Sequence, residues 1–462
     1  MYCKLKDNFL LRGWKLLPTG IVNKTNGQIQ FLSQARYNAI KKCDGLHEEN
    51  SFSAEESNFV LNSGLVDKIE TPSALRAEQE YKFYDNRFMA SVHWLITGKC
   101  NARCKHCYMS APDAVFGEPS HELCMNIIDK MAACGIQSVT LSGGDPLIRK
   151  DFWEIVDSLL SHGIFIEKVM TNGLLLNDSL LDKFEARGIK PSIQMSFDGT
   201  DGWHDWMRGI KGAEKAVVHA FDICHKRGFD TSCGFCWHKG NRHVLHDSLK
   251  LLGSLGVGSV KVNNLDPVGA AENIREYAMT FDEYFNEMLK YIPQYIEDGA
   301  PVPVRFQGMF VADDAESYRI GLCKTSEDKP NDNSCLCGAM RNSMTIDPEG
   351  RMLPCGMFND LPALYKKYPN IKDVAIKDLL TKSAYFDFIN IRLKEFFRHN
   401  TECAACEFKY RCGSGCRGRA ILKDANHDIW AADKGNCTFF KGGYYSRLID
   451  FMDDLNVKRL GA

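Results

Sequence analysis

Three cysteines near residue 100 form the most distinctive chemical feature of the sequence. The segment TGKCNARCKHCYMS places Cys100, Cys104 and Cys107 at the spacing C-x3-C-x2-C. Thiolates this close together can bind zinc or an iron–sulfur cluster. A zinc site would normally use paired C-x2-C knuckles and a fourth ligand, and the nearby His106 is poorly placed because it adjoins Cys107. Three thiolates instead suit three irons of a four-iron cluster, which leaves the fourth iron open.

A second group of cysteines lies in the last third of the chain. Cys337 and Cys355 flank Gly350 in the form C-x12-G-x4-C. The others follow as C-x2-C-x5-C-x3-C with one more twenty residues later: Cys403, Cys406, Cys412, Cys416 and Cys437. Ten of the nineteen cysteines fall in these two groups. Such clustering in a reducing compartment indicates metal or cluster ligation, although a C-x2-C pair alone would also suit a zinc ribbon.

The remaining cysteines are expected in the core. Cys233 and Cys236 also form a C-x2-C pair, but residues three apart on a strand face opposite sides and cannot easily share a metal. The same core interpretation applies to the other scattered cysteines, which are Cys3, Cys43, Cys124, Cys134 and Cys224.

Composition bounds the class of protein. The chain has 462 residues, of which 44% are hydrophobic and 25% charged, so it is globular and long enough for two to four domains. It has no apolar run approaching the roughly 18 residues of a membrane helix. The first residues lack the features of a secretory signal, so we expect a cytoplasmic protein. A net charge of -2 without a long basic run argues against a nucleic-acid partner.

Strand and helix patterns alternate through the middle of the chain. The predicted strands are residues 90–97, 136–144, 164–173, 191–199, 230–238 and 257–265. Each strand after the first is reached through a helix, which predicts parallel strands with right-handed crossovers, either as a partial barrel or as an open sheet. The first cysteine group follows the first strand, at the carboxyl end where parallel α/β folds place active sites.

The flanking segments have different patterns. Residues 1–70 predict a hairpin with a tight turn at Asn26-Gly27, followed by short helices, as in a small winged-helix-like unit. Residues 71–90 are polar and are interpreted as a linker. Residues 323–334 predict a polar loop, and residues 442–455 a closing helix.

The first cysteine group carries a family resemblance. C-x3-C-x2-C followed by the aromatic Tyr108, at the end of the first strand of a six-fold βα unit, closely resembles the radical S-adenosylmethionine (SAM) enzymes. This resemblance implies that the open iron is chelated by SAM. One electron then cleaves SAM to methionine and a 5'-deoxyadenosyl radical, which abstracts a hydrogen atom from the substrate.

Later strand ends extend the resemblance over roughly residues 90–310. SGGDP, with Gly143, Gly144 and Asp145, follows the second strand where the family has a GGE-type motif that meets the SAM amino group. The acid here is one methylene shorter than the family's glutamate. The resemblance also implies that the ends of the third, fourth and sixth strands line the ribose, methionyl and adenine parts of SAM: Thr171 and Asn172, Ser196 and Asp198, and Asn263.

The second cysteine group resembles the SPASM extension of radical SAM enzymes, which binds two auxiliary four-iron four-sulfur clusters and would bring the total to three. The resemblance assigns a nearer set, Cys337, Cys355 and Cys416, and a farther set, Cys403, Cys406, Cys412 and Cys437. The fourth ligand of the nearer cluster is Cys323, Cys335 or an open site that accepts a substrate thiolate. Cys323 is favoured because family members often place this ligand several residues upstream.

Two segments resemble parts of peptide-modifying SPASM enzymes. The run DGTDGWHDWMRGIKG resembles DG-x-H-x-x-RG-x-x-G through His204, Arg208, Gly209 and Gly212, with three residues in place of two between His204 and Arg208. Arg208 either contributes to the cofactor and substrate site or only pins this loop. The amino-terminal segment resembles the PqqD-like recognition element of ribosomal peptide maturases, in which an exposed sheet edge captures a leader peptide.

These inferences predict three domains: a peptide-recognition module (1–85), a radical SAM core built as a partial (β/α)6 TIM-like barrel (86–310) and a SPASM domain (311–462). We expect an α/β oxidoreductase that takes electrons from a flavodoxin or ferredoxin and cross-links a leader-bearing precursor peptide. The first expectation is a Cys thioether, followed by a carbon–carbon bond. The alternatives are formylglycine formation, as in anaerobic sulfatase maturation, and a non-enzymatic peptide-binding or redox-sensing protein. No membrane partner is expected.

Overall fold

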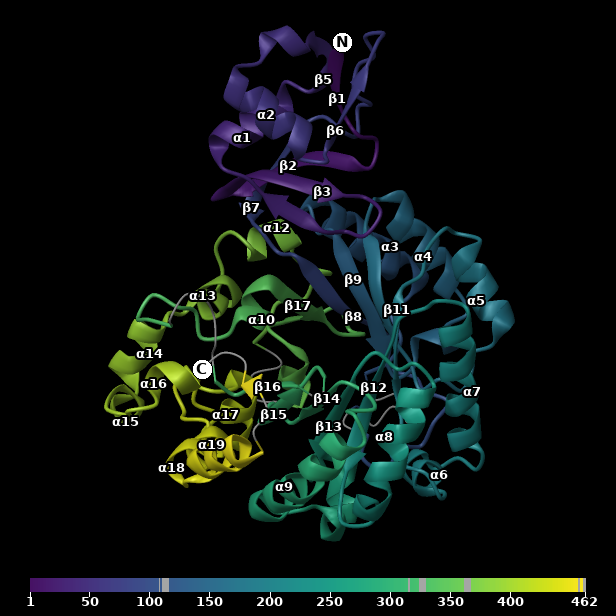
Figure 1. Cartoon of the computed structure of the whole chain (residues 1–462), viewed down its shortest axis with the longest axis vertical. Helices are drawn as coiled ribbons and strands as arrows, with labels where there is room; N and C mark the ends of the chain where they lie inside the picture. Colours follow the sequence, from purple (N-terminus) through teal and green to yellow (C-terminus); the bar gives the residue numbers. More distant parts are fainter. Residues whose placement is uncertain are drawn as a thin grey trace.

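The computed structural model describes residues 1–107, 109, 116–314, 316–323, 330–360, 367–455 and 458–459. Tyr108, which was expected beside the cofactor, lies outside these residues. An amino-terminal module sits above a larger body in which an α/β core and the carboxyl-terminal helices lie side by side (Figure 1).

Six parallel strands form the centre of the core and confirm the predicted alternation of strand and helix. In sheet order they are β8 (Ser91–Thr97), β9 (Ser138–Gly143), β10 (Phe165–Met170), β11 (Ser192–Ser196), β12 (Thr231–Trp237) and β13 (Val260–Asn264). The helices between them are α3 (His121–Ala133), α4 (Phe152–Ser161), α5 (Asp178–Glu185), α6 (Trp203–Arg208), α7 (Ala213–Lys226) and α8 (Leu245–Ser254). Apolar side chains on the longer helices pack onto the sheet, as the periodicity requires.

The sheet continues beyond these six strands on both sides. On one side β17 (Ser343–Ile346) pairs parallel with β8 and antiparallel with β18 (Met352–Leu353). On the other side the order is β14 (Val304–Phe306), β15 (Phe310–Ala312), β16 (Ser317–Ile320) and β19 (Lys458–Arg459). The end strands β18 and β19 are not paired with each other in the described structure, so the barrel is partial. Because β17 joins β8, the sheet crosses the expected boundary at residue 310.

The amino-terminal module contains two small sheets and two helices. One sheet has the order β5-β1-β6 and the other β4-β3-β2-β7. The strands are β1 (Tyr2–Leu5), β2 (Phe9–Lys15), β3 (Leu17–Asn23), β4 (Ile29–Phe31), β5 (Asp44–Glu48), β6 (Val66–Ile69) and β7 (Lys82–Arg87). The helices are α1 (Gln34–Lys41) and α2 (Ala54–Asn62), which begin at the capping residues Ser33 and Ser53.

Two expectations for this module are wrong. The tight turn at Asn26-Gly27 is instead a longer loop, residues 24–28, in which Gly27 has φ +69°. The tight turn of the module lies at Leu16, between β2 and β3. The segment 71–90 is not simply a linker, because its residues in β7 pair parallel with β2. A short strand with alternating charged residues carries too weak a hydrophobic pattern to be recognised alone.

The module docks on the core through aromatic side chains. The indole of Trp14 is fully buried, stacks on Tyr84 and donates a hydrogen bond of 3.2 Å to the carbonyl of Cys134. Gly135 has φ +70°, and a Cβ there would lie 2.5 Å from the Tyr84 ring. A glycine is therefore required where α3 ends against the module. We define the amino-terminal module as residues 1–87.

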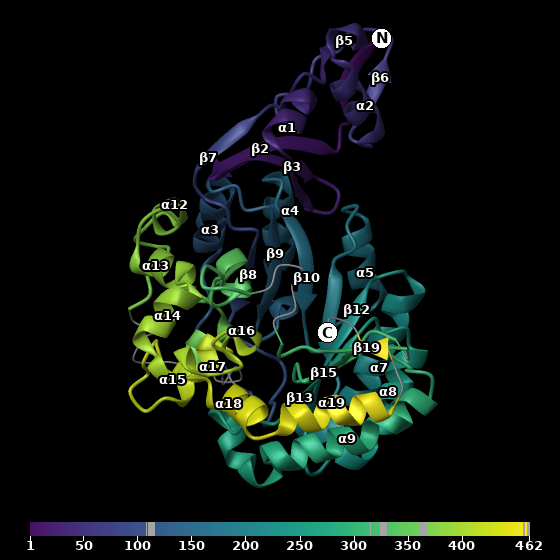
Figure 2. The same ribbon diagram turned by 60° about the vertical axis from the view of Figure 1, so that its left-hand side comes forward.

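The carboxyl-terminal part is built mainly from short helices. These are α9 (Phe281–Glu297), α10 (Gly338–Asn342), α12 (Ile376–Leu379), α13 (Ala384–Asn390), α14 (Leu393–His399), α15 (Thr401–Ala404), α16 (Lys409–Cys412), α17 (Arg417–Lys423), α18 (Lys434–Lys441) and α19 (Tyr444–Asp454). The predicted closing helix is confirmed as α19, which lies along α9 in Figure 2, with Tyr444 packed on Phe281. In the part of the chain described, no helix has the length and apolar character needed to cross a bilayer.

Short 3-10 turns complete the described structure: η1 (Glu49–Ser51), η3 (Pro146–Ile148), η4 (Arg242–Val244), η5 (Gly269–Tyr277) and η6 (Gly356–Asp360). The buried apolar side chains of the core and of the carboxyl-terminal part form one continuous cluster. The module has two small clusters of its own. The core and the carboxyl-terminal part are therefore packed as one body, with the module docked on it.

Candidate active site

The first cysteine group lies where the sequence predicts, in the loop after β8 at the carboxyl edge of the sheet. Cys100, Cys104 and Cys107 line a pocket of about 240 Å³. The other predicted residues in its wall are Gly143, Gly144, Thr171, Asn172, Ser196 and Arg208. The structure thus brings the ends of β8, β9, β10 and β11 together around one cavity.

Close backbone contacts position one side of the cysteine loop. The N–H of Gly144 donates to the carbonyl of Thr97 at 2.8 Å, and the N–H of Asp145 donates to Lys99 at 2.9 Å. A Cβ at Gly144 would lie 2.0 Å from the carbonyl oxygen of Lys99. The second glycine of SGGDP is therefore needed for the approach of two loops.

Helix α6 holds the other side of the loop. The N–H of Arg103 donates to the carbonyl of Arg208 at 3.0 Å, and the N–H of Lys105 donates to Met207 at 2.9 Å. Gly209 has φ +66°, and a Cβ there would lie 2.6 Å from the Arg103 carbonyl. The RG pair of the motif thus fixes the cysteine loop through the main chain.

The thiols are surrounded by hydrogen-bond donors. Cys100 Sγ accepts from the N–H of Ala102 at 3.4 Å and from Nδ2 of Asn172 at 3.6 Å, and Cys104 Sγ accepts from Nη1 of Arg208 at 3.5 Å. Burial raises the pKa of the Cys100 thiol to about 11. Burial also raises the pKa of Cys104, against the opposing charge of Arg208. Metal ions deprotonate such thiols, and N–H donors stabilise the resulting thiolates.

The donor set fits an iron–sulfur cluster. Among the described residues, no three His, Cys, Asp or Glu side chains converge as ligands of a single metal ion. A cluster differs because each thiolate binds its own iron. Three thiols facing one pocket beside N–H donors and a glycine-lined wall therefore suit the group that the sequence predicts.

Asp145 is not placed as the sequence predicts. Its carboxylate is fully buried and accepts from Thr171 Oγ1 at 2.7 Å, from the N–H of Asn172 at 2.8 Å and from the N–H of Leu147 at 3.0 Å. Burial raises its pKa, and these hydrogen bonds oppose the rise. Asp145 is not among the described residues that line the pocket. The shorter aspartate ties the ends of β9 and β10 together and does not reach into the cavity.

Asp198 is also buried behind the pocket wall. Its Oδ2 forms an ion pair with Arg208 Nη2 at 2.6 Å, and its Oδ1 accepts from the N–H of Cys236 at 3.0 Å. Nδ1 of His204 accepts from the main-chain N–H of Asp198 at 3.1 Å. Burial alone would raise the pKa of Asp198, but the charge of Arg208 holds it well below its usual range. Of this group, only Arg208 reaches the pocket.

The sixth strand contributes through its following loop. Asn263 lies on β13 and is outside the described residues that line the pocket. The N–H of Ala270, in the segment after β13, donates to the carbonyl of Cys107 at 3.3 Å. The nearby C-x2-C pair behaves as expected for a strand, because Cys233 is buried in the core while Cys236 packs on the other side against Met207.

The farther cysteine set comes together completely. Cys403, Cys406, Cys412 and Cys437 line one small pocket between α15, α16 and α18. Asn436 Nδ2 donates to Cys412 Sγ at 3.5 Å. Lys409 and Lys441 also line this pocket. The four thiols that the family resemblance assigned to the farther set thus line one pocket.

The three assigned cysteines of the nearer set lie together. Burial, followed by the charges of Cys416 and Cys337, raises the pKa of the Cys355 thiol to about 12, so these three thiols are neighbours. Cys323, the favoured fourth ligand, lies beside Tyr445 and Cys412. Its role as the fourth ligand stays a prediction.

The other candidate for the fourth ligand is Cys335. It forms an antiparallel bridge with Arg392, and its thiol is close to Arg87. Its role as a ligand of the nearer cluster stays a prediction.

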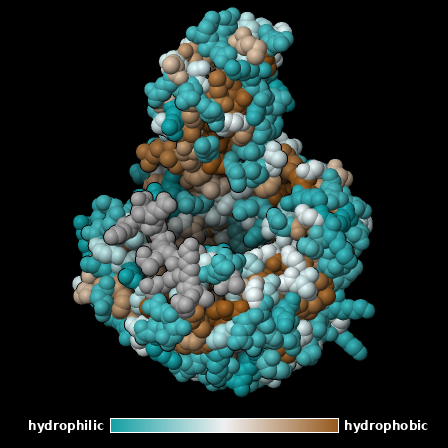
Figure 3. Space-filling model, viewed as in Figure 1, coloured by the Kyte–Doolittle hydropathy of each residue, from teal (hydrophilic) through white to brown (hydrophobic). Residues whose placement is uncertain are grey.

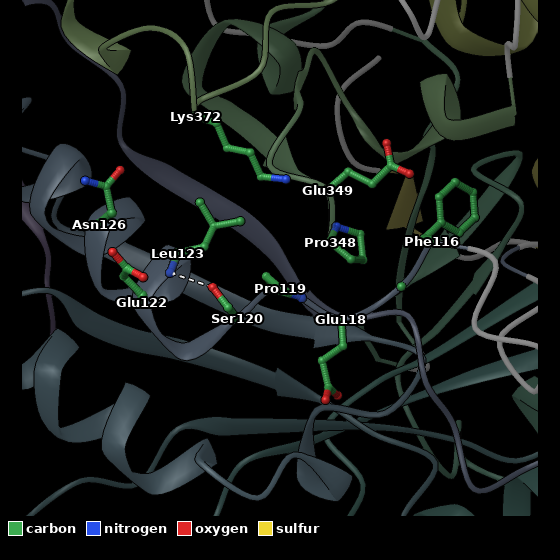
Figure 4. A pocket seen from close by; sticks show the side chains of 11 residues that line it. Phe116, Glu118, Pro119, Ser120, Glu122, Leu123, Asn126, Pro348, Glu349 and Lys372 are labelled. Carbon is green, nitrogen blue, oxygen red and sulfur yellow. Dashed lines mark hydrogen bonds between the residues drawn. The ribbon is translucent and has the colours of Figure 1, made fainter.

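The sequence did not reveal a second, larger cavity. A pocket of about 720 Å³ lies between the start of α3 and the carboxyl-terminal part, lined by Phe116, Glu122, Leu123, Glu349 and Lys372 among others (Figure 4). Its two walls are more than 200 residues apart in the sequence, so no local pattern could predict it. Phe116, like Cys100 and Cys107, packs against the small apolar cluster of Leu95 and Met109, which places this pocket next to the cysteine loop. The surface is hollowed where the core and the carboxyl-terminal part meet below the module (Figure 3).

Comparison with known proteins defines the class. Residues 94–252 match the Radical SAM superfamily, and residues 335–407 match SPASM, an iron–sulfur cluster-binding domain. The chain therefore combines a radical SAM domain with a SPASM domain and is a radical SAM enzyme. These domains imply SAM and iron–sulfur clusters as cofactors. The alternative of a non-enzymatic sensor is not supported.

Several relatives are enzymes. The AdoMet-dependent heme synthase of Methanosarcina barkeri is 27% identical over 342 residues, which covers 73% of this chain and 93% of the relative. The PqqA peptide cyclase of Gluconobacter oxydans is 24% identical over 335 residues, covering 72% of this chain and 86% of the relative. The crystal structure of Streptococcus suis SuiB bound to precursor peptide SuiA shares the fold, with a TM-score of 0.63, 13% identity and coverage of 92% of this chain and 98% of that one.

Proposed function

We propose that this protein is a radical SAM peptide maturase that abstracts hydrogen from a ribosomally made precursor peptide and forms a cross-link, with a Cys thioether as the first expectation. The observation that most supports this proposal is the extent of the fold shared with SuiB. The amino-terminal module is 87 of 462 residues, about 19% of the chain, whereas that match leaves only 8% of the chain uncovered. More than half of the module therefore falls within the matched fold, which SuiB presents with a precursor peptide bound.

The chain's own residues support radical generation at the pocket after β8. Cys100, Cys104 and Cys107 would hold three irons, and the bound cluster and SAM would supply a carbon radical. Gly144, Asn172 and Ser196 form the walls against which SAM would be oriented. The main-chain contacts of Gly144 and α6 keep the cysteine loop in place at the wall of the cavity.

The second cysteine group would hold two auxiliary clusters, which brings the total to three. The farther set supports a cluster with four thiolates. The nearer set of Cys337, Cys355 and Cys416 supports a cluster with three. Such clusters can accept an electron when a substrate radical forms a bond. The electron that starts each turnover would come from a flavodoxin or ferredoxin.

The module would recognise the leader, as a PqqD-like element does. Its two sheets present four edge strands in the described structure, β4 and β7 in one and β5 and β6 in the other. Edge strands have unpaired main-chain groups that an extended peptide can satisfy. The large pocket between the core and the carboxyl-terminal part would then receive the segment that is modified, because Phe116 links that pocket to the cysteine loop.

A second candidate is a reaction in heme biosynthesis. It is favoured by the heme synthase relative, whose identity of 27% exceeds that of the peptide cyclase. A porphyrin substrate gives no role to the module. Formylglycine formation is the remaining alternative, and the module also weighs against it.

Anaerobic reconstitution followed by assays with two substrate classes tests the proposal. We expect about twelve irons per chain, as three four-iron clusters require, together with reductive SAM cleavage. A precursor peptide encoded beside the gene should lose two hydrogen atoms per cross-link, measured by mass spectrometry. A porphyrin should be unchanged. Turnover of the porphyrin alone, or a peptide aldehyde, would replace the proposed function by one of the alternatives.

Cysteine variants test the assignment of the clusters. Replacing Cys100, Cys104 and Cys107 by Ala should abolish SAM cleavage and lower the iron content by about a third, because the auxiliary clusters remain. Cys323→Ala tests the favoured fourth ligand of the nearer cluster: a lower iron content would support its thiol as a ligand, and the wild-type iron content would exclude it. Persistent SAM cleavage in the triple variant would refute the site assignment.

A further inference from the structure

The side chain of Arg208 is enclosed between an acid and a cysteine of the first group. Arg208 is only 7% exposed, and Asp198 is completely buried. Nη2 of Arg208 lies 2.6 Å from Asp198 Oδ2, and Nη1 donates to Cys104 Sγ at 3.5 Å. One guanidinium therefore contacts both a permanent negative charge and a thiol that becomes a thiolate when iron binds.

Loop pinning does not account for this side chain. The cysteine loop is held by the main-chain carbonyls of Met207 and Arg208, which accept from Lys105 and Arg103. Any residue at position 208 would supply the same carbonyl. The guanidinium is thus available for another role, and its two contacts are both electrostatic.

A cation beside a cluster thiolate changes the free energy of adding an electron to the cluster. Reduction makes the cluster more negative, and a positive charge that donates a hydrogen bond to a ligand sulfur stabilises the reduced form. The effect is large in a buried site because the surrounding dielectric is low. Asp198 acts in the opposite direction, since its negative charge opposes the same reduction. The pair therefore applies two opposed charges, of which Arg208 is the one that contacts the sulfur.

We propose that Arg208 is a positioning residue that raises the reduction potential of the SAM-binding cluster through Cys104, and that Asp198 limits the rise. This rests on the proposed function only in assigning Cys104 as a ligand of that cluster. It does not depend on the substrate.

Two variants with opposite expected effects test the proposal. Arg208→Gln should lower the potential, because a neutral amide replaces the cation, and Asp198→Asn should raise it. We expect about a tenfold change in the equilibrium constant for one-electron reduction in each case, which equals 59 mV for a one-electron couple. Arg208→Lys keeps the charge and should lie between the wild type and Arg208→Gln.

The measurement is an anaerobic potentiometric titration of the holoenzyme monitored by electron paramagnetic resonance. The SAM-binding cluster is identified as the signal that changes when SAM is added. Arg149→Gln is the matched control, because Arg149 is also buried and paired with an aspartate, Asp151 at 2.7 Å, but donates to the carbonyls of Ile96 and Pro119 and to no thiol. It should leave the potential unchanged, and the auxiliary signals should not move in any variant.

The outcomes separate this role from others. A purely structural role would shift the potential of the Arg208→Gln and Asp198→Asn variants in the same direction or not at all, and either result overturns the proposal. Weaker SAM binding in Arg208→Gln with an unchanged potential would assign the side chain to SAM and also overturn it. If Arg208→Gln fails to assemble the cluster, Arg208→Lys and Asp198→Asn still decide the sign. Opposite shifts without peptide turnover would uphold this inference and reject the peptide function.

Discussion

Two aspartates that follow the ends of β9 and β11 show how surroundings decide side-chain chemistry. Asp145 and Asp198 are both completely buried. Asp145 accepts hydrogen bonds from neutral donors only, and burial raises its pKa. Asp198 faces Arg208, whose charge outweighs burial and lowers its pKa. The same residue type thus serves as a structural tie in one loop and as one half of an ion pair beside the cluster thiols in the other.

A histidine on β8 should make stability depend on pH. Burial, together with the nearby charge of Lys168, lowers the pKa of His93 to about 4. The unfolded chain therefore binds a proton near pH 6.5 that the folded chain does not, and stability falls as the pH is lowered from about 7 to 5. In His93→Gln this fall should be smaller by about 1 to 2 kcal/mol.

Urea unfolding followed by circular dichroism at pH 7, 6 and 5 checks this expectation. His219→Gln is a suitable control, because His219 is exposed on α7, and it should keep the wild-type dependence. Equal slopes for wild type and His93→Gln would show that His93 does not carry the effect.

At the scale of elements, the site depends on loops that approach one another more closely than a side chain allows. The end of β9 and the cysteine loop meet at Gly144, and the end of α6 meets the same loop at Gly209. Sequence resemblance assigns Gly144 to SAM contact. The structure adds that a glycine is required there for the two loops to meet, even before a cofactor binds.

Gly144→Ala should disrupt cluster assembly. The added methyl group would overlap the Lys99 carbonyl and push the cysteine loop away from the end of β9. We expect iron content to fall by about a third, because only the SAM-binding cluster is affected, and SAM cleavage to be lost. Gly234→Ala on β12 is the matched control, since a Cβ there meets no atom within 4 Å. Normal iron content and cleavage in Gly144→Ala would show that the loops can separate without harm.

At the scale of the whole molecule, long-range pairing joins segments that the sequence separates. Strand β17 of the carboxyl-terminal part lies next to β8, so the nearer cysteine set is attached to the same sheet as the first cysteine group. Strand β7 belongs to the module yet leads directly into β8. The three parts therefore share a continuous framework.

Docking of the module should depend on Trp14. Its ring is fully buried against Tyr84 and Phe88 at the end of α3. Trp14→Ala would leave a cavity and should cost about 3 to 5 kcal/mol, with faster amide hydrogen exchange in residues 1–87. Phe83→Ala is the matched control, because Phe83 is 50% exposed on the neighbouring strand. Unchanged exchange in Trp14→Ala would mean that the module is held by other contacts.

The sequence alone determined the local features of this protein. Cysteine spacing predicted the gathering of the first group, and the resemblance to the SPASM extension predicted that of the farther set. Hydrophobic periodicity predicted six strands with helices between them, because both signals depend on residues close together in the chain. The polar strand β7 carried too little of that signal.

Only the tertiary structure decided which groups face one another. It tied Asp145 to Thr171 at the sheet edge, brought Cys323 beside Tyr445 and placed Arg208 between Asp198 and Cys104. It also formed the large pocket from walls far apart in sequence. These outcomes depend on competition among buried hydrogen bonds, charges and long-range strand pairs, which no local pattern contains.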